Sequence, residues 1–310
     1  MKYQVLVKKQ RKTCVNNERG LGGIQVHPSF DENRWVDLYY TTNKFGNCNE
    51  DANNGPVNRL SRFILQADNT IDPQSEIVFF DTPSLELDFH NGGRIEFGKD
   101  GYLYTSTGDG GNKDAVQDPS NLLGAMIRLT DEGGIPPDNP YATDPDGVRC
   151  NVNGKADTQS GKCLELYALG LRNPFRFSMD PNTSGNKVRF IINNVGASAW
   201  ESQFEGGDDV NGTQYTFGLP NYGWPILEGP CKSGKTGDCN EGDYDGDFIR
   251  SYHFYQHQDG GANTASTFVP NGIWPSEYDN AHLYAEFVFG EIYVLKDNGV
   301  ENCYSCTPAT

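Results

Sequence analysis

Residues 86–112, ELDFHNGGRIEFGKDGYLYTSTGDGGN, have the pattern of two strands joined by a tight turn. Arg94–Phe97 alternates polar and apolar side chains, as a half-buried strand does. Tyr102–Thr107 alternates again and is rich in β-prone residues. Between them, Lys99-Asp100-Gly101 supplies the turn, because glycine adopts a positive φ without steric cost. The stretch therefore predicts a β-hairpin.

His90 and Asp109 flank this hairpin, one before its first strand and the other after its second. A hairpin brings these two ends together, so we expect an imidazole and a carboxylate to meet at one rim. Such a pair is how proteins orient and charge a general base. Taken alone, a packed or surface histidine is the commoner outcome, and an aspartate before Gly110-Gly111 is more often a turn residue.

The composition is that of a strand-rich and turn-rich chain. Its 310 residues include 36 Gly, 17 Pro, 16 Tyr and 17 Phe but only 3 Met, which argues against long helices. The length suits a single large all-β domain spanning residues 1–310. A net charge of −17 disfavours binding to nucleic acid and to anionic membranes. No apolar run is long enough to span a membrane.

Eight cysteines spread through loops suggest disulfides and an extracellular or secretory-pathway protein. Cys150/Cys163 and Cys231/Cys239 each bracket a polar loop and are predicted to form local disulfides. Cys303-x-x-Cys306 has the spacing of half a zinc site, but no second half accompanies it.

Two further features of the sequence bear on the prediction of a secreted protein. Two sequons, at Asn182 and Asn211, agree with it. Residues 1–14 lack the apolar core of a signal peptide, so either the start is incomplete or the protein follows another route.

A strand–turn–strand unit recurs along the chain. It begins near Gly23, again at Gly93 and again at Arg176, with no helical pattern between the copies. A repeated hairpin at such spacing suggests the blades of a β-propeller with long loops. A β-sandwich is the alternative, but it would not explain the repeat.

The second half of the chain holds three further candidates. Arg172-Asn173 stand at a strand end, and a guanidinium suits carboxylate or quinone oxygens, although a surface ion pair is the commoner fate of an arginine. Asn221-Tyr-Gly-Trp224-Pro is an aromatic turn that either lines a sugar-binding mouth or packs. Residues 241–247 form a carboxylate-dense loop that either binds Ca²⁺ or is simply exposed.

Together these segments resemble the glucose/sorbosone dehydrogenase family, which includes PQQ-dependent sugar dehydrogenases. The collinear matches are ERGLGGIQVHP (18–28), HNGGRIEFG (90–98), STGD (106–109), NLLGAMIRL (121–129), IPPDNPY (135–141), LRNPFRF (171–177) and NYGWP (221–225). The resemblance implies an all-β, six-bladed β-propeller, here with first and last blades that look incomplete.

The resemblance also implies an oxidoreductase that acts on the CH–OH group of an aldose-type sugar, with an external electron acceptor. His90 would be the base that takes the hydroxyl proton while a hydride passes to the quinone. Asp109 would orient His90 and support its positive charge.

The same resemblance implies a cofactor site for PQQ and Ca²⁺. Arg172 and Asn173 would hydrogen-bond the quinone oxygens, and Glu18 would lie near the cofactor, where the glucose enzyme has a glutamine. The backbone carbonyls of Gly196 and Ala197 would coordinate the Ca²⁺ ion.

Several departures from the family favour an alternative. A lysine that binds the PQQ carboxylates is absent from Phe287-Val-Phe-Gly290, Glu201 is followed by Ser202 rather than a second glutamate, and the chain stops at Thr310. Either the sequence is clipped, or the propeller closes differently and holds PQQ weakly. The alternative function is a non-catalytic propeller that binds a protein or glycan partner, as the hedgehog-interacting protein does.

Overall fold

The computed structural model describes residues 13–158, 160–208, 218–237, 239 and 248–296, and its architecture is all-β. The helical segments described are single short turns: α1 (Phe30–Asn33), η1 (Pro73–Ser75), η2 (Lys113–Ala115) and η5 (Ser276–Tyr278). None of the helices in these residues is long and apolar enough to cross a membrane.

Four antiparallel sheets follow one another along the chain. The first is β1 (Leu21–Val26), β2 (Trp35–Thr42), β3 (Val57–Ile64) and β4 (Ile77–Asp81), and the second is β5 (Gly92–Phe97), β6 (Leu103–Thr107), β7 (Ala125–Leu129) and β10 (Leu166–Leu169). The third is β11 (Pro174–Met179), β12 (Arg189–Asn194), β13 (Trp200–Gly207) and β16 (His253–Gln256), and the fourth is β17 (Asn263–Phe268), β18 (His282–Glu286) and β19 (Glu291–Leu295). Two small ladders, β8 (Gly147–Val148) with β9 (Lys162–Cys163) and β14 (Leu227–Glu228) with β15 (Cys231–Lys232), lie in the connections.

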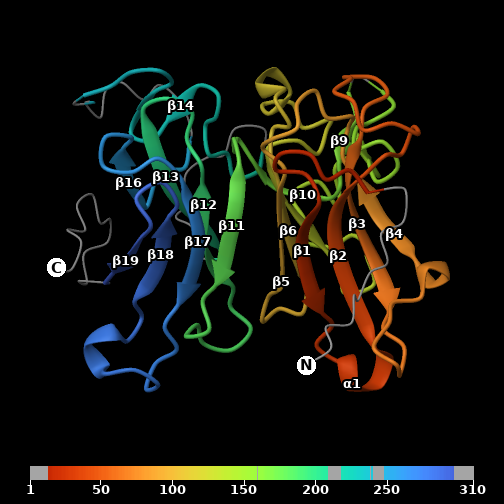
Figure 1. Cartoon of the computed structure of the whole chain (residues 1–310), viewed down its shortest axis with the longest axis horizontal. Helices are drawn as coiled ribbons and strands as arrows, with labels where there is room; N and C mark the ends of the chain where they lie inside the picture. Colours follow the sequence, from red (N-terminus) through yellow and green to blue (C-terminus); the bar gives the residue numbers. More distant parts are fainter. Residues whose placement is uncertain (1–12, 159, 209–217, 238, 240–247, 297–310) are drawn as a thin grey trace.

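The sheets are arranged like blades. Their first strands β1, β5, β11 and β17 pack side by side in that order. The first sheet runs outward to β4 at one margin of the molecule, and the fourth runs outward to β19 near the other (Figure 1). The three repeated hairpins of the sequence are β1–β2, β5–β6 and β11–β12, as expected.

The predicted count of six blades is not confirmed, because the described residues form four sheets of this kind. The first described sheet, β1–β4, has as many strands as the second and third sheets, so the described residues do not show the incomplete first blade that the sequence suggested. The last described sheet has three strands.

The core lies between the faces of neighbouring sheets. Adjacent residues of β6 point to opposite faces, as strand geometry requires. Leu103 packs with Leu60 of the first sheet, and Tyr104 packs with Phe190 of the third. Burying each such side chain stabilises the fold by about 1.5–3 kcal/mol. The second sheet is covered on both faces, which explains why β6 and β7 are buried at every position.

One predicted strand begins later than expected. The sequence pattern predicted a strand from Asn121 to Leu129, but β7 begins at Ala125. Asn121 instead forms a turn, because its Oδ1 accepts the N–H of Leu123 at 2.9 Å and Gly124 adopts a φ of 60°. Asparagine side chains favour such local hydrogen bonds over a ladder. The expected strand at residues 3–7 lies outside the described residues.

The predicted disulfides Cys150–Cys163 and Cys231–Cys239 are both present. A third, Cys14–Cys48, closes a longer loop. Cys303, Cys306 and the acidic loop 241–247 lie outside the described residues.

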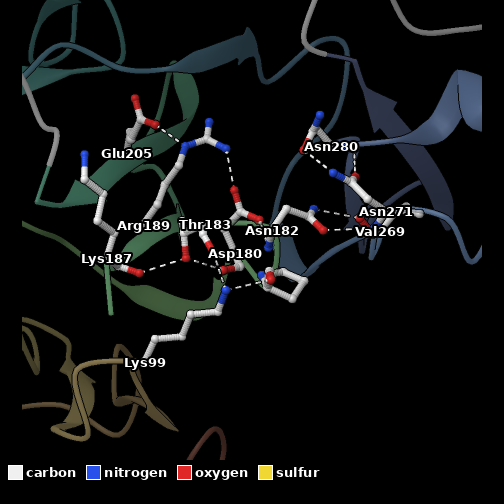
Figure 2. Close-up of polar contacts among 11 residues, drawn as sticks. Lys99, Asp180, Asn182, Thr183, Lys187, Arg189, Glu205, Val269, Asn271 and Asn280 are labelled. Carbon is white, nitrogen blue, oxygen red and sulfur yellow. Dashed lines mark hydrogen bonds and ion pairs between the residues drawn. The ribbon is translucent and has the colours of Figure 1, made fainter. Parts of the chain in front are cut away.

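Turns at one end of the molecule tie three sheets together (Figure 2). Lys99, in the β5–β6 turn, donates to the carbonyl of Pro181 at 2.8 Å. Asn182 donates to the carbonyl of Val269 at 3.0 Å and accepts the N–H of Asn271 at 2.9 Å. The carboxamide of the first sequon thus joins the third and fourth sheets; the sequon at residue 211 lies outside the described residues.

The imidazole of His282 gives the fold a pH dependence. It is 1% exposed, and neither ring nitrogen has a partner among the described residues. Burial, with smaller effects of Arg189 and His253, lowers the pKa of His282 to about 3. The unfolded chain therefore binds more protons between roughly pH 3 and 6.5, and stability falls as the pH drops through that window.

We expect His282→Phe, beside the ring of Phe268, to flatten this dependence by up to about 1.4 kcal/mol per pH unit. Urea unfolding of both proteins at about pH 7 and about pH 5 measures the slope. Equal slopes for the variant and the wild type would show that His282 is not the source.

Candidate functional site

The expected contact between His90 and Asp109 is present. His90 Nδ1 lies 2.7 Å from Asp109 Oδ1, where the start of β5 meets the end of β6. The backbone of His90 is left-handed, with a φ of 58°, and its N–H donates to Glu18 Oε2 at 2.9 Å. Glu18 therefore holds the main chain of His90 in a conformation that non-glycine residues seldom adopt.

Asp109 is the acceptor for several donors. Its Oδ1 also accepts the N–H of Gly111 at 2.9 Å, and its Oδ2 accepts Trp224 Nε1 at 3.0 Å. A carboxylate facing Nδ1 places the proton of a neutral imidazole on that atom and leaves Nε2 as the acceptor. No described contact occupies Nε2, and the His90 side chain is 12% exposed. The ring can therefore accept a proton from a ligand.

Trp224 belongs to the site, which the sequence did not establish. Its indole N–H meets Asp109, and the guanidinium carbon of Arg172 lies 5.7 Å from the centroid of its ring. The aromatic turn 221–225 was a candidate for either sugar binding or packing. The structure shows instead that Trp224 contacts Asp109 of the His90–Asp109 pair, which is called the dyad below.

Arg172 connects the dyad to the third sheet. Its carbonyl accepts the N–H of Asp109 at 2.8 Å, and its Nη1 donates to the carbonyl of Val195 at 3.1 Å. Burial lowers the pKa of Arg172, although Asp109, Glu201 and other carboxylates nearby oppose the shift. The guanidinium has several more N–H donors than these described contacts use.

Asn173 lies deeper and supports the backbone. It is 2% exposed, and its Oδ1 accepts the N–H of Gly92 at 3.3 Å. The N–H groups of Arg172 and Asn173 both donate to Asn194 Oδ1, at 3.0 and 3.1 Å. These contacts fix the start of β11 against the start of β5.

Gly196 and Ala197 lie in the loop between β12 and β13, where the N–H groups of residues 196–200 all point at carboxylates. Glu228 Oε1 accepts from residues 197, 198, 199 and 200 at 2.7–3.2 Å, and Glu201 Oε1 accepts from Gly196 at 3.1 Å. Burial by itself would raise the pKa of Glu228, but these hydrogen bonds together lower it. The described residues contain no group of three or more His, Cys, Asp or Glu side chains suited to a metal. Any cation site here would rely on backbone carbonyls.

Glu201 also pairs with His257, a contact that no local pattern of the sequence indicates. His257 Nε2 lies 2.9 Å from Glu201 Oε1, while Glu201 Oε2 accepts the N–H of Asn263 at 3.1 Å. Burial raises the pKa of Glu201, and the hydrogen bond to Glu201 raises that of His257. This pair links the loop to the start of the fourth sheet.

Glu18 also lines a cavity of about 100 Å³. The cavity lies where β1, β5 and β11 meet and includes Asn91, Gly92 and Arg176 in its wall. Its wall has both polar and apolar side chains, it lies directly beside the backbone that carries His90, and its size suits a few water molecules.

Comparison with known proteins identifies the relatives of this chain. The profile of the family described as Glucose / Sorbosone dehydrogenase matches residues 2–303. Aldose sugar dehydrogenase YliI of Escherichia coli is 28% identical over 212 residues, which cover 68% of this chain and 47% of that protein. The human hedgehog-interacting protein is 27% identical over 188 residues, covering 57% of this chain and 24% of that protein. The chain thus spans about half the length of the first relative and a quarter of the second.

Solved structures show the same fold. The PQQ-bound form of aldose sugar dehydrogenase from Streptomyces coelicolor superposes with a TM-score of 0.65 at 19% identity, covering 96% of this chain and 69% of that one.

The role of Trp224 can be tested by removing its indole N–H. Trp224→Phe leaves one oxygen of a buried carboxylate without its donor, which we expect to lower the free energy of unfolding by about 1–3 kcal/mol. Trp274→Phe, at a half-exposed position, is the matched control and should change it by less than about 0.5 kcal/mol. Denaturant unfolding measures both, and equal losses would contradict the structural role of the Trp224–Asp109 bond.

Proposed function

Because the chain belongs to the glucose/sorbosone dehydrogenase family, we propose that it is a single-domain sugar dehydrogenase that uses PQQ and Ca²⁺ to oxidise an aldose-type sugar. The observation that carries this proposal is the 2.7 Å His90–Asp109 contact, with Nε2 of the ring open. The likeness to a PQQ-bound aldose sugar dehydrogenase supports the cofactor, and the single family match from residue 2 to 303 supports one domain.

In this proposal His90 is the general base. Its Nε2 accepts the proton of the sugar hydroxyl as the C–H bond gives up a hydride, and the hydroxyl carbon becomes a carbonyl carbon. Asp109 stabilises the imidazolium that results, because its charge lies against Nδ1. PQQ, when bound, supplies the oxidant that accepts the hydride.

The residues present fit such a cofactor. Arg172 has donors left for quinone oxygens and is held in place by Val195 and Trp224. Asn173 lies next to Arg172 and holds the backbone of Gly92, and Glu18 lies on the other side of His90, whose N–H it accepts. The carbonyls of Gly196 and Ala197 are the hard oxygen ligands that Ca²⁺ prefers.

The three disulfides support an extracellular or secretory location, where such bonds persist. The partners in this proposal are a sugar and an external electron acceptor.

One observation favours a partner-binding function instead. Phe287, Val288 and Phe289 stand where the sequence departs from the family by lacking a lysine, and they are 55–74% exposed. Exposed apolar clusters often mark interaction sites. The human hedgehog-interacting protein among the relatives is consistent with this second candidate.

Removing the base tests the catalytic proposal. We expect His90→Ala to abolish PQQ-dependent dye reduction with sugars while PQQ binding and the thermal unfolding temperature stay close to those of the wild type.

Arg172→Ala should weaken PQQ binding as well as the rate, because it removes the donors to the quinone. Full activity in His90→Ala, or no activity in the wild type with PQQ and Ca²⁺, would favour the partner-binding function.

The orienting carboxylate has a matched control within the chain. We expect Asp109→Asn to lower kcat by roughly 10²–10⁴-fold, the range that a positioned acid–base group contributes. Asp131 lies 3.7 Å from His27, away from the hairpin rim, so Asp131→Asn removes a carboxylate from another histidine and should leave kcat unchanged. Steady-state kinetics measure kcat of both variants. An equal fall in kcat for Asp109→Asn and Asp131→Asn would contradict the role of Asp109.

A further inference from the structure

We propose that Glu228, assisted by Glu201, is the positioning residue of the cation site: it gathers the N–H groups of residues 197–200 on one side of the loop and thereby presents the carbonyl oxygens of Gly196 and Ala197 to Ca²⁺. This inference rests on the proposed function, because that function places Ca²⁺ at these two carbonyls. It adds a residue on which the site depends although it does not itself touch the ion.

The N–H groups of residues 197–200 converge on one oxygen of Glu228. Glu228 Oε1 accepts the N–H of Ala197 at 2.9 Å and of Ser198 at 2.7 Å, and it also accepts those of residues 199 and 200. Successive N–H groups that converge in this way form a concave site for an anion. Here a side chain of the same protein occupies that site, so the loop is held without any added ligand.

The direction of the carbonyls follows from peptide geometry. In a planar trans peptide, the N–H and the C=O of the same unit point in opposite directions. The carbonyl of Gly196 shares a peptide with the N–H of Ala197, and the carbonyl of Ala197 shares one with the N–H of Ser198. Both N–H groups point at Glu228, so both carbonyls point away from it. Neither carbonyl accepts a backbone hydrogen bond from the described residues.

The neighbouring peptide unit is held from two sides. The carbonyl of Val195 accepts Arg172 Nη1 at 3.1 Å, while the N–H of Gly196 donates to Glu201 at 3.1 Å. Residue 196 must also be glycine, because a Cβ there would lie 1.6 Å from the carbonyl oxygen of Trp200. These contacts hold the loop in this conformation, with the carbonyls of Gly196 and Ala197 turned away from Glu228.

Glu228 is itself held by the structure around it. It ends β14, pairs with Cys231 of β15, and lies beside the Cys231–Cys239 disulfide. Its second oxygen accepts the N–H of Gly234 at 3.3 Å. A rigid hairpin therefore sets the position from which the carboxylate reaches the loop.

The experiment measures cation binding to the PQQ-free protein. Tb³⁺, a luminescent substitute for Ca²⁺ that nearby tryptophans sensitise, is titrated and then displaced with Ca²⁺. The background carries Asp243→Asn, Asp245→Asn and Asp247→Asn, which removes the acidic loop as a second binder of cations. We expect Glu228→Gln to weaken Ca²⁺ binding roughly 10- to 100-fold, as loss of an outer-shell partner does.

Two further variants separate position from charge and from general stability. Glu286→Gln is the matched control, because Glu286 likewise accepts four backbone N–H groups, those of residues 261, 262, 288 and 289, and should leave Ca²⁺ affinity within about twofold. Glu228→Asp keeps the charge but is one methylene too short to reach all four amides, and we expect it to weaken binding as well.

The outcomes are distinct. If the wild type binds neither Tb³⁺ nor Ca²⁺, the cation site of the proposed function fails and this inference fails with it. If the wild type binds but Glu228→Gln binds equally well, only the positioning role is wrong. Unchanged affinity in Glu228→Asp would also overturn it, since charge alone would then suffice. Circular dichroism confirms that each variant is folded at the temperature of the titration.

Discussion

The carboxylate of Asp109 is the contact on which the site depends. It ends the hairpin of the second sheet, orients the ring of His90 through Nδ1, and receives the indole N–H of Trp224 from a segment that packs with the third sheet. A buried carboxylate without partners would cost several kcal/mol, and Asp109 has three: the ring of His90, the N–H of Gly111 and the indole of Trp224. The geometry that suits a general base is therefore also a condition for stable packing between two sheets.

On the other side of Arg172, buried carboxylates are again held by hydrogen-bond donors, which here are backbone N–H groups. Glu228 and Glu201 are buried, and both take amide N–H groups from residues 196–200. Arg172 lies between the two walls, with its carbonyl bonded to Asp109 and its guanidinium bonded to Val195. Part of the large negative charge of the chain is thus placed inside the protein, where it organises loops. The positive charge of Arg172 is partly desolvated among these carboxylates and is available to a ligand with acceptor oxygens.

The features that could be predicted from the sequence are those that follow from local patterns. The β5–β6 hairpin follows from alternation and from the glycine turn, and the His90–Asp109 contact follows from the hairpin. Trp224 lies 115 residues from Asp109, and Glu228 lies 31 residues from Ala197, so those contacts arise from sheet packing that no local pattern contains. The number of blades is not predictable in the same way: a repeated hairpin shows what each unit is, but the number of units comes only from the packed chain, of which the described residues show four such sheets.

The two ends of the inner strands β5 and β11 differ in their backbone. One end has unstrained turns joined by hydrogen bonds, and the other end, where the site lies, has a strained residue. At one end of β11 and β5, turns are joined by ordinary hydrogen bonds such as those of Lys99 and Asn182 (Figure 2). At the other end His90 has a left-handed backbone, which costs free energy and persists only where surrounding structure imposes it. Glu18, in the segment just before β1, supplies that constraint by accepting the N–H of His90. Because β6 and β7 of the same sheet are buried at every position, the sheet that carries His90 is held firmly behind it. A rigid sheet core is therefore a requirement for the position of the His90 ring, and the polar contacts far from the site contribute to it through the packing they preserve.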